Sequence, residues 1–110
     1  MFIGAWDRPD QDKETRQEYA ETSIQELIES YPQAVSEWQI VESKIVHFEE
    51  YSEVYLDQID QQDFNLFRIA IKVIIFDSYF VKLTFMDYWC SNLSESKQIS
   101  DPIFNSFQAK

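Results

Sequence analysis

Residues 67–89 read FRIAIKVIIFDSYFVKLTFMDYW, and this stretch decides the fold. Over residues 67–76, and again over 81–89, side chains alternate with a period of two and are rich in β-branched and aromatic types. Such alternation is typical of β-strands, and residues 77–79 between the two runs carry turn-forming side chains. The sequence therefore predicts a β-hairpin over residues 67–89.

The register of this hairpin is predicted from the faces of its strands. A two-residue loop places Val73 opposite Lys82 and so mixes apolar and charged side chains on one face. A three-residue loop pairs Phe76 with Phe80 and places Val73 opposite Leu83. Because a one-residue slip turns every side chain to the other face, we predict the three-residue loop. The polar face then carries Arg68, Lys72 and Lys82, either covered by acids of an N-terminal helix or exposed.

The sequence before the hairpin predicts a helix and a less certain region. Apolar residues recur at helical spacing from Ala20 to Leu27, and Asp10 is a suitable N-cap, which predicts a helix over about residues 11–30. Residues 1–10 are predicted to form an arm or a short edge strand. Residues 33–63 fit either a second helix or short strands, and we favour strands, at Trp38–Val41, Lys44–Phe48 and Glu53–Gln58.

The C-terminal stretch, residues 91–110, is polar and is predicted to cross the surface as a tail, with Ile103 and Phe104 as a small apolar anchor. A chain of 110 residues is expected to form one domain. We therefore predict a single α+β domain in which the N-terminal helix packs on a small antiparallel sheet centred on the 67–89 hairpin. The alternative is an all-α acidic bundle.

The net charge of −11 is concentrated in one part of the chain. Residues 17–67 contain twelve acids and one base, Lys44, whereas the remaining residues contain eight of each. Acidic helix surfaces are common and aid solubility. Ordinary surfaces, however, intersperse both signs, so this asymmetry favours a face that binds a partner. Nucleic acid and anionic membranes would be repelled, which leaves a basic protein as the predicted partner.

Motifs for catalysis and cofactor binding are not found in the sequence. His47 and Cys90 are the single residues of their types, and neither lies in a nucleophile motif, so both are predicted to be structural. A cluster of His47 with Glu50 and Glu53 lacks the Glu-x-x-His pairs of bundle metal sites. The single glycine excludes a phosphate-binding loop or dinucleotide fingerprint. We predict no enzyme activity, no cofactor and no metal. Two carboxylate pairs, Glu49–Glu50 and Asp60–Asp63, would be the first candidates for acid–base chemistry.

The predicted partner-binding residues are acids with aromatic anchors among them. They are Glu42, Glu49, Glu50, Glu53, Asp57, Asp60, Tyr51, Tyr55 and Trp38. A single cysteine and an amino terminus without signal-peptide features predict a cytoplasmic protein.

Three functions fit these features. The first is an inhibitor, such as an immunity protein or antitoxin that neutralises a nuclease-type toxin, because complementary charge speeds association. The second is a phage inhibitor of restriction or CRISPR effectors that mimics nucleic acid. Such mimicry requires Glu49, Glu53, Asp57 and Asp60 to form an evenly spaced row. The third is a small ligand-binding domain or enzyme with an aromatic pocket.

Overall fold

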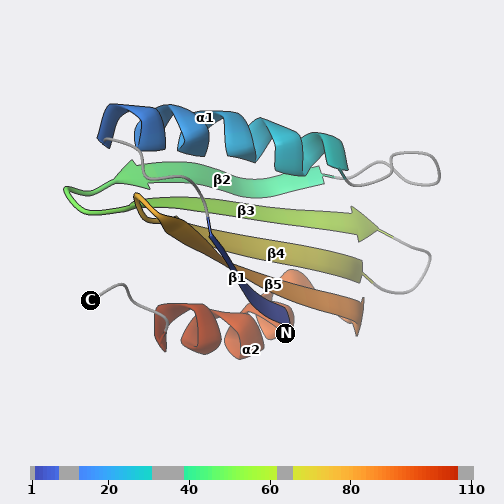
Figure 1. Cartoon of the computed structure of the whole chain (residues 1–110). Coiled ribbons are helices and arrows are strands. Elements are labelled where there is room, and N and C mark those ends of the chain that lie inside the picture. The colour runs from blue at the N-terminus through green and yellow to red at the C-terminus, as the bar shows by residue number, and fades with distance from the viewer. Residues whose placement is uncertain (1, 8–12, 31–38, 62–65, 107–110) are drawn as a thin grey trace.

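The computed structural model describes residues 2–7, 13–30, 39–61 and 66–106, which form an α+β protein. A five-stranded antiparallel sheet has the strand order β1-β5-β4-β3-β2 (Figure 1). The elements along the chain are β1 (Phe2–Asp7), α1 (Lys13–Ser30), β2 (Gln39–His47), β3 (Ser52–Gln61), β4 (Leu66–Ile75), β5 (Tyr79–Cys90) and α2 (Leu93–Ser106). Strands β2 to β5 are neighbours in sequence and in space, whereas β1 lies at the far edge, beside β5.

Each face of the sheet is covered by one helix, and Figure 1 shows α1 and α2 on opposite sides. Helix α1 packs mainly on β3 and β2, and α2 packs on β5 and β4. The core under α1 joins Ala20 to Val54, Ile69, Ile71, Val73 and Ile75. The core under α2 joins Phe104 to Ala70, Ile74, Leu83 and Phe85. The central strand β4 therefore carries buried apolar residues on both faces, as expected for a strand covered on both sides, with Arg68 and Lys72 among those on the α2 face.

The hairpin predicted over residues 67–89 is confirmed, but its predicted register is wrong. The backbone N–H of Phe76 donates to the carbonyl of Tyr79 at 2.8 Å, and Val73 lies opposite Lys82, which is the two-residue pairing. The prediction assumed one polar face. Helix α2, however, buries the second face as well. The observed register places Leu83 and Phe85 on that face, opposite Lys72 and Ala70, where they join the core under α2.

The N-terminal predictions are confirmed where the structure describes them. Helix α1 spans Lys13–Ser30, and β1 is an edge strand. The preference for strands within residues 33–63 is also confirmed, although β2 runs continuously where two short strands were expected. The all-α alternative is excluded by the sheet. Asp10, the predicted N-cap, and Trp38 lie outside the described residues.

The prediction of an irregular C-terminal tail is wrong, because residues 93–106 form α2. The side-chain oxygen of Asn92 accepts a hydrogen bond from the backbone N–H of Glu95 at 2.9 Å, which is an N-cap contact. The polar residues Ser96 and Ser100 are buried against the sheet. The expected anchor is present, since Phe104 is only 4% exposed. No helix in the described part of the chain combines the length and apolar character needed to cross a membrane.

Candidate protein-interaction surface

The two hairpin turns lie side by side at one end of the sheet. Ser52, which begins β3, pairs with Ile75, which ends β4, so the β2–β3 turn is adjacent to the β4–β5 turn. The turns share a sequence pattern: residues 48–51 are Phe-Glu-Glu-Tyr and residues 76–79 are Phe-Asp-Ser-Tyr. In each turn the backbone N–H of the Phe donates to the carbonyl of the Tyr at 2.8 Å. The two turns thus share the same sequence pattern and the same closing hydrogen bond.

The four aromatic rings of these turns form a continuous row. The ring centroids are 4.5 Å apart for Phe48 and Tyr51, 5.8 Å for Tyr51 and Phe76, and 4.6 Å for Phe76 and Tyr79. The two ends of the row are open to solvent, because Phe48 is 41% and Tyr79 40% exposed. Rings held by stacking lose little entropy on binding, and aromatic residues are enriched among binding hot spots.

Three carboxylates flank this row, and a buried arginine contacts both turns. Glu49, Glu50 and Asp77 are exposed in the two turns. Arg16 of α1 is fully buried and reaches both turns: its Nη1 donates to Asp77 Oδ1 at 3.1 Å, and its Nη2 donates to the carbonyls of Phe48 at 2.8 Å and Glu49 at 3.2 Å. The positive charge is therefore inside while the acids face solvent. We call residues 48–51 and 76–79 together the turn-end surface.

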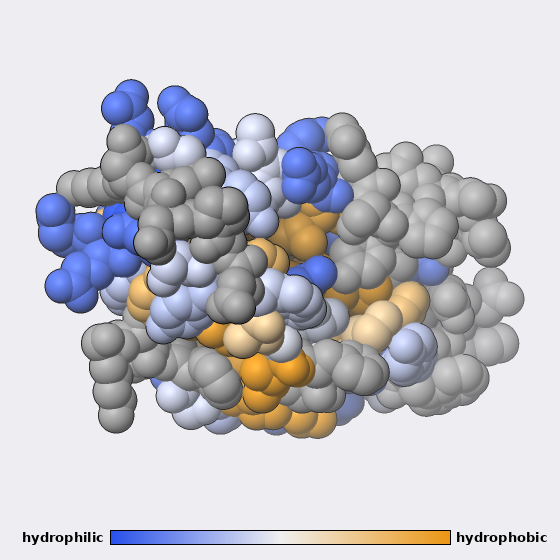
Figure 2. All heavy atoms as spheres, in the orientation of Figure 1, coloured by the Kyte–Doolittle hydropathy of each residue, from blue (hydrophilic) through white to orange (hydrophobic). Residues whose placement is uncertain are grey.

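The outer face of α1 continues the negative charge away from the turns. Glu14, Glu18, Glu21 and Glu26 are exposed along this helix. Over residues 14–27, where the side chains of α1 are described, the one base is Arg16, which points inward. Figure 2 shows hydrophilic atoms gathered over α1 and at the end of the molecule where α1 begins. Four acids of the acidic stretch and its start are therefore exposed on α1, and the one base within residues 14–27 is buried.

Other acids of the predicted set are internal or paired. Asp57 is 0% and Asp60 5% exposed, so neither contributes to a surface. Glu53 lies 3.7 Å from the Nζ of Lys72, and Glu42 lies 3.3 Å from that of Lys44. Glu53 and Asp57 lie on one face of β3 and Asp60 on the other, and Asp57 and Asp60 are buried, so the evenly spaced row required for nucleic-acid mimicry is not formed.

The structure thus brings together Glu49, Glu50 and Tyr51 of the predicted set. Tyr55 lies apart, in a groove beside α2, and Trp38 lies outside the described residues. Sequence reasoning missed Phe48, Phe76, Asp77 and Tyr79. The repeated Phe-acid-x-Tyr pattern was the signal that could have identified them.

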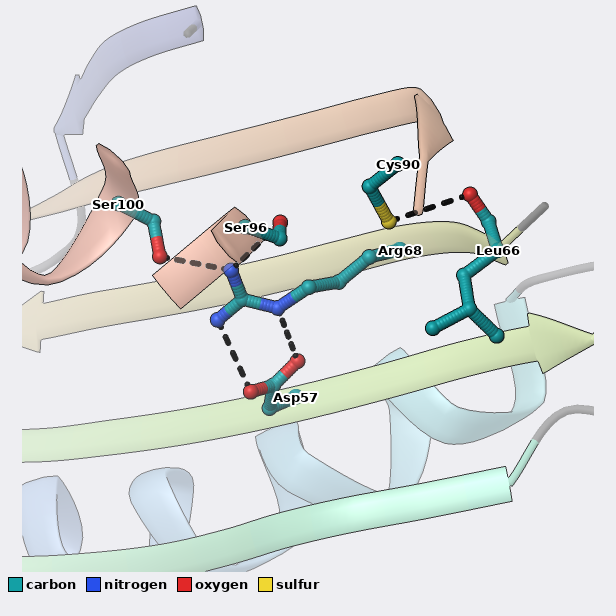
Figure 3. A network of polar contacts seen from close by, with 6 residues as sticks. All are labelled: Asp57, Leu66, Arg68, Cys90, Ser96 and Ser100. Atoms are coloured by element: carbon teal, nitrogen blue, oxygen red, sulfur yellow. Dashed lines mark hydrogen bonds and ion pairs between the residues drawn. The ribbon is translucent and has the colours of Figure 1, made fainter. Parts of the chain in front are cut away.

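Asp57 belongs to a buried polar network that joins α2 to the sheet (Figure 3). Arg68 makes a two-pronged contact with it: Nε donates to Asp57 Oδ1 at 2.9 Å and Nη2 donates to Oδ2 at 3.0 Å. Nη1 donates to the hydroxyls of Ser96 at 3.0 Å and Ser100 at 2.7 Å. Burial lowers the pKa of Arg68, but the Asp57 carboxylate, with a smaller contribution from Tyr55, more than offsets this, so the pKa lies above its ordinary value. Arg68 was predicted on the polar face of the hairpin, either covered by acids of the N-terminal helix or exposed. It is instead buried, between Asp57 of β3 and the two serines of α2.

His47 and Cys90 do not form a catalytic pair. His47 pairs with Ser52 at one end of β3, whereas Cys90 pairs with Leu66, which lies opposite Gln61 at the other end of β3. The Cys90 thiol is buried, which raises its pKa, and it donates to the carbonyl of Leu66 at 3.3 Å. Within the described ranges, no group of three or more histidine, cysteine or acidic residues is placed to hold a metal ion.

A groove of about 320 Å³ lies between α2 and the β2–β3 hairpin. It is lined by Glu42, Lys44, Val46, Glu53, Tyr55, Lys72, Lys97, Asp101, Phe104 and Asn105. Its acids and bases are equal in number, and two of the pairs are in contact. This balance distinguishes the groove from the acidic surface described above.

Tyr55 in this groove is expected to make stability fall at alkaline pH. Burial, with a smaller contribution from the Asp57 charge, raises the pKa of Tyr55 from 10.0 to about 12. The folded chain then holds the phenol proton more tightly than the unfolded chain. This contribution is complete below pH 10 and is lost as the pH rises from about 10 to about 12. Urea unfolding below pH 10 and at about pH 11 measures the loss, which Tyr55→Phe should reduce. An identical loss in the Phe variant would contradict the assignment to Tyr55.

Comparison with known proteins does not assign the fold or the surface. No family model matches the chain, and neither curated proteins nor solved structures give a significant match.

Proposed function

We propose that this protein acts without catalysis, by binding a basic protein partner through the turn-end surface and the adjoining outer face of α1. The class of function that this fits best is an inhibitor, such as an immunity protein or antitoxin that neutralises a nuclease-type toxin. One observation supports the proposal above the others: a row of four aromatic rings, made of two stacked pairs in tilted contact, is flanked by exposed carboxylates at one end of the sheet.

The two components have separate physical roles. Exposed carboxylates on the turns and on α1 attract a basic partner at long range and raise the association rate. Phe48 and Tyr79, each about two-fifths exposed, provide rigid apolar area that slows dissociation once contact is made. A ring beside a carboxylate also suits a lysine or arginine side chain, since the cation is attracted by both groups. The surface therefore fits a basic partner better than a neutral one.

The nucleic-acid-mimic alternative is less well supported, because Asp57 and Asp60 are buried and β3 is a strand. The alternative of a small ligand-binding domain or enzyme is favoured by one observation, the 320 Å³ groove lined by Tyr55, Lys72 and Lys97. The ligand-binding class and the inhibitor class predict different effects of substitution. Substitutions in the groove would abolish ligand binding, whereas substitutions in the turns would abolish partner binding.

Reversing two turn acids, Glu49→Lys with Glu50→Lys, is expected to slow association with the partner by about tenfold. The partner is first isolated by capture from the native cell and its competitors. Its binding is then measured by surface plasmon resonance at about 0.1 M and about 1 M salt, where the Debye length is about 10 Å and about 3 Å. The difference between variant and wild type should shrink at the higher salt.

A matched control separates the position of the charges from their number. Glu95→Lys with Asp101→Lys, both exposed on α2, changes the net charge by the same +4, from −11 to −7. This control is expected to bind at close to the wild-type rate. If it slows association as much as the turn variant does, net charge alone explains the effect. An unchanged rate in the turn variant would exclude the turn-end surface.

Phe48→Ala tests whether the exposed ring holds the bound partner. This variant should speed dissociation and leave the association rate nearly unchanged.

A further inference from the structure

The sheet has two edge strands, β1 and β2, and they differ in how they are protected. Edge strands expose unpaired backbone groups, and soluble proteins guard them with bulges and charged side chains. Strand β2 has both devices: a bulge between Ile40 and Glu42, and the charged residues Glu42 and Lys44. Strand β1 has no bulge in its pairing with β5, and its one charged residue, Asp7, is the last of the strand, after Phe-Ile-Gly-Ala-Trp at residues 2–6. Of the described strands, β1 pairs with β5 alone.

The side chains of β1 are unusually exposed for their types. Ile3 is 57% and Trp6 48% exposed, and Ala5 is exposed as well. The Trp6 ring stacks on Phe80 with the centroids 5.2 Å apart and lies over Gly4, where any Cβ atom would collide with the ring. Figure 2 shows hydrophobic atoms at the surface in the lower centre of the view, in the region of β1 and α2. This edge is therefore apolar, and no further strand of the described residues pairs with it.

The distribution of charge indicates at which edge strand a second copy of the chain can bind. Two chains of net charge −11 repel each other if their acidic regions meet, as they would across β2. Strands β2 and β3, which carry acids of residues 17–67, lie toward the edge of the sheet opposite β1, and α1 packs mainly on these two strands. If two copies joined at β1, nine strand spacings would separate the two β2 strands, or roughly 43 Å at about 4.8 Å each. The Debye length at physiological salt is about 8 Å, so this repulsion would be screened.

We propose that β1 pairs antiparallel with β1 of a second copy of this chain about a two-fold axis, which joins the two five-stranded sheets into one. A two-fold axis perpendicular to the sheet keeps each face on its own side. Ile3 and Ala5, which lie opposite Leu83 and Val81 on the α2 face, then lie beside Ile3 and Ala5 of the other copy. A basic partner has no charge on residues 3–6 of this edge to recognise, so the edge suits a second copy better than the partner of the turn-end surface.

Analytical ultracentrifugation tests this pairing directly. The wild-type chain is expected to sediment as a species of twice its 13.2 kDa monomer mass at micromolar concentration. Ile3→Lys with Ala5→Lys places like charges beside each other across the two-fold axis and should weaken the dimer by about tenfold or more. The matching variant Ile3→Glu with Ala5→Glu should be weakened in the same way. An equimolar mixture of the two should recover dimers, because opposite charges then meet.

The recovery separates pairing from misfolding, since a variant that fails to fold would not regain a partner on mixing. Ile40→Lys places the same charge on the exposed residue of the other edge and should leave the dimer unchanged. A wild-type chain that remains a monomer at about 100 μM would overturn the proposal and leave β1 to a strand from another protein. Dissociation by Ile40→Lys in place of the β1 variants would also overturn it, since it would assign the interface to β2.

Discussion

Replacing Arg68 by methionine is expected to lower the free energy of unfolding by about 3–5 kcal/mol. The side chains of Arg68 and Asp57 are both 0% exposed and are joined by two hydrogen bonds. Methionine fills a similar volume but leaves the Asp57 carboxylate uncompensated in the interior. It also removes the donor that Ser96 and Ser100 share. A domain of this size is stabilised by about 5–15 kcal/mol in total, so the loss is a large fraction.

The magnitude depends on leaving one charge without its partner, and a second variant tests this reason. Asp57→Leu combined with Arg68→Met removes both charges, and apolar replacement of a buried pair is often neutral. The double variant is therefore expected to be more stable than Arg68→Met alone. Urea unfolding measures both, and the midpoint of the single variant should fall by at least about 1 M. A loss below about 1 kcal/mol in Arg68→Met, or a larger loss in the double variant, would contradict this account.

This network also explains why the C-terminal helix was not predicted from the sequence. Residues 93–100 are polar, and polarity was interpreted as exposure to solvent. Ser96 and Ser100 are instead buried, because Arg68 offers a donor to each of them across the interface. A pattern that places a small polar residue every fourth position cannot be distinguished from a surface tail without knowing that a buried arginine faces it. The partner lies about thirty residues away in sequence, beyond the reach of local periodicity.

The same missing helix accounts for the wrong hairpin register. The strands were predictable from alternation alone, because a period of two is a local property. Their pairing was inferred from one buried face, and that inference fails once α2 covers the other. Lys82 then lies opposite Val73 on the α1 face, and Leu83 faces α2. The failure to predict α2 therefore also gave the wrong register for β4 and β5, on which α2 packs.

The candidate surface was predictable in part. Charge counting placed the acids within residues 17–67, but their orientation depends on bases elsewhere in the chain. Asp57 is neutralised by Arg68, and Glu53 lies beside Lys72, both from β4. The turn acids Glu49 and Glu50 are exposed, as is usual for the side chains of connecting turns. Residue counts identify the excess of charge, whereas the fold decides which part of it a partner can meet.

The second large effect is expected at Arg16, whose replacement by methionine should cost about 2–3 kcal/mol. The guanidinium group is fully buried and joins α1 to both hairpin turns, through Asp77 and the carbonyls of Phe48 and Glu49. Hydrogen bonds from a charged donor contribute more than neutral ones, and methionine leaves both carbonyls without this donor. The cost is lower than at Arg68 because the side chain of Asp77 is 52% exposed and regains water.

The location of the effect distinguishes this variant from a general loss of stability. Amide hydrogen exchange of Phe48 and Phe76, whose N–H groups close the two turns, should accelerate in Arg16→Met before that of the central strands. Asp77→Asn is the matched control and should cost less than about 1 kcal/mol, since it removes only the exposed half of one ion pair. Equal costs for the two variants would assign the stabilisation to the ion pair alone. Uniform acceleration across the sheet would show that Arg16 supports the whole fold.

With the turns loosened selectively, the four rings would lose their fixed spacing, so partner dissociation should accelerate although Arg16 itself does not reach the surface.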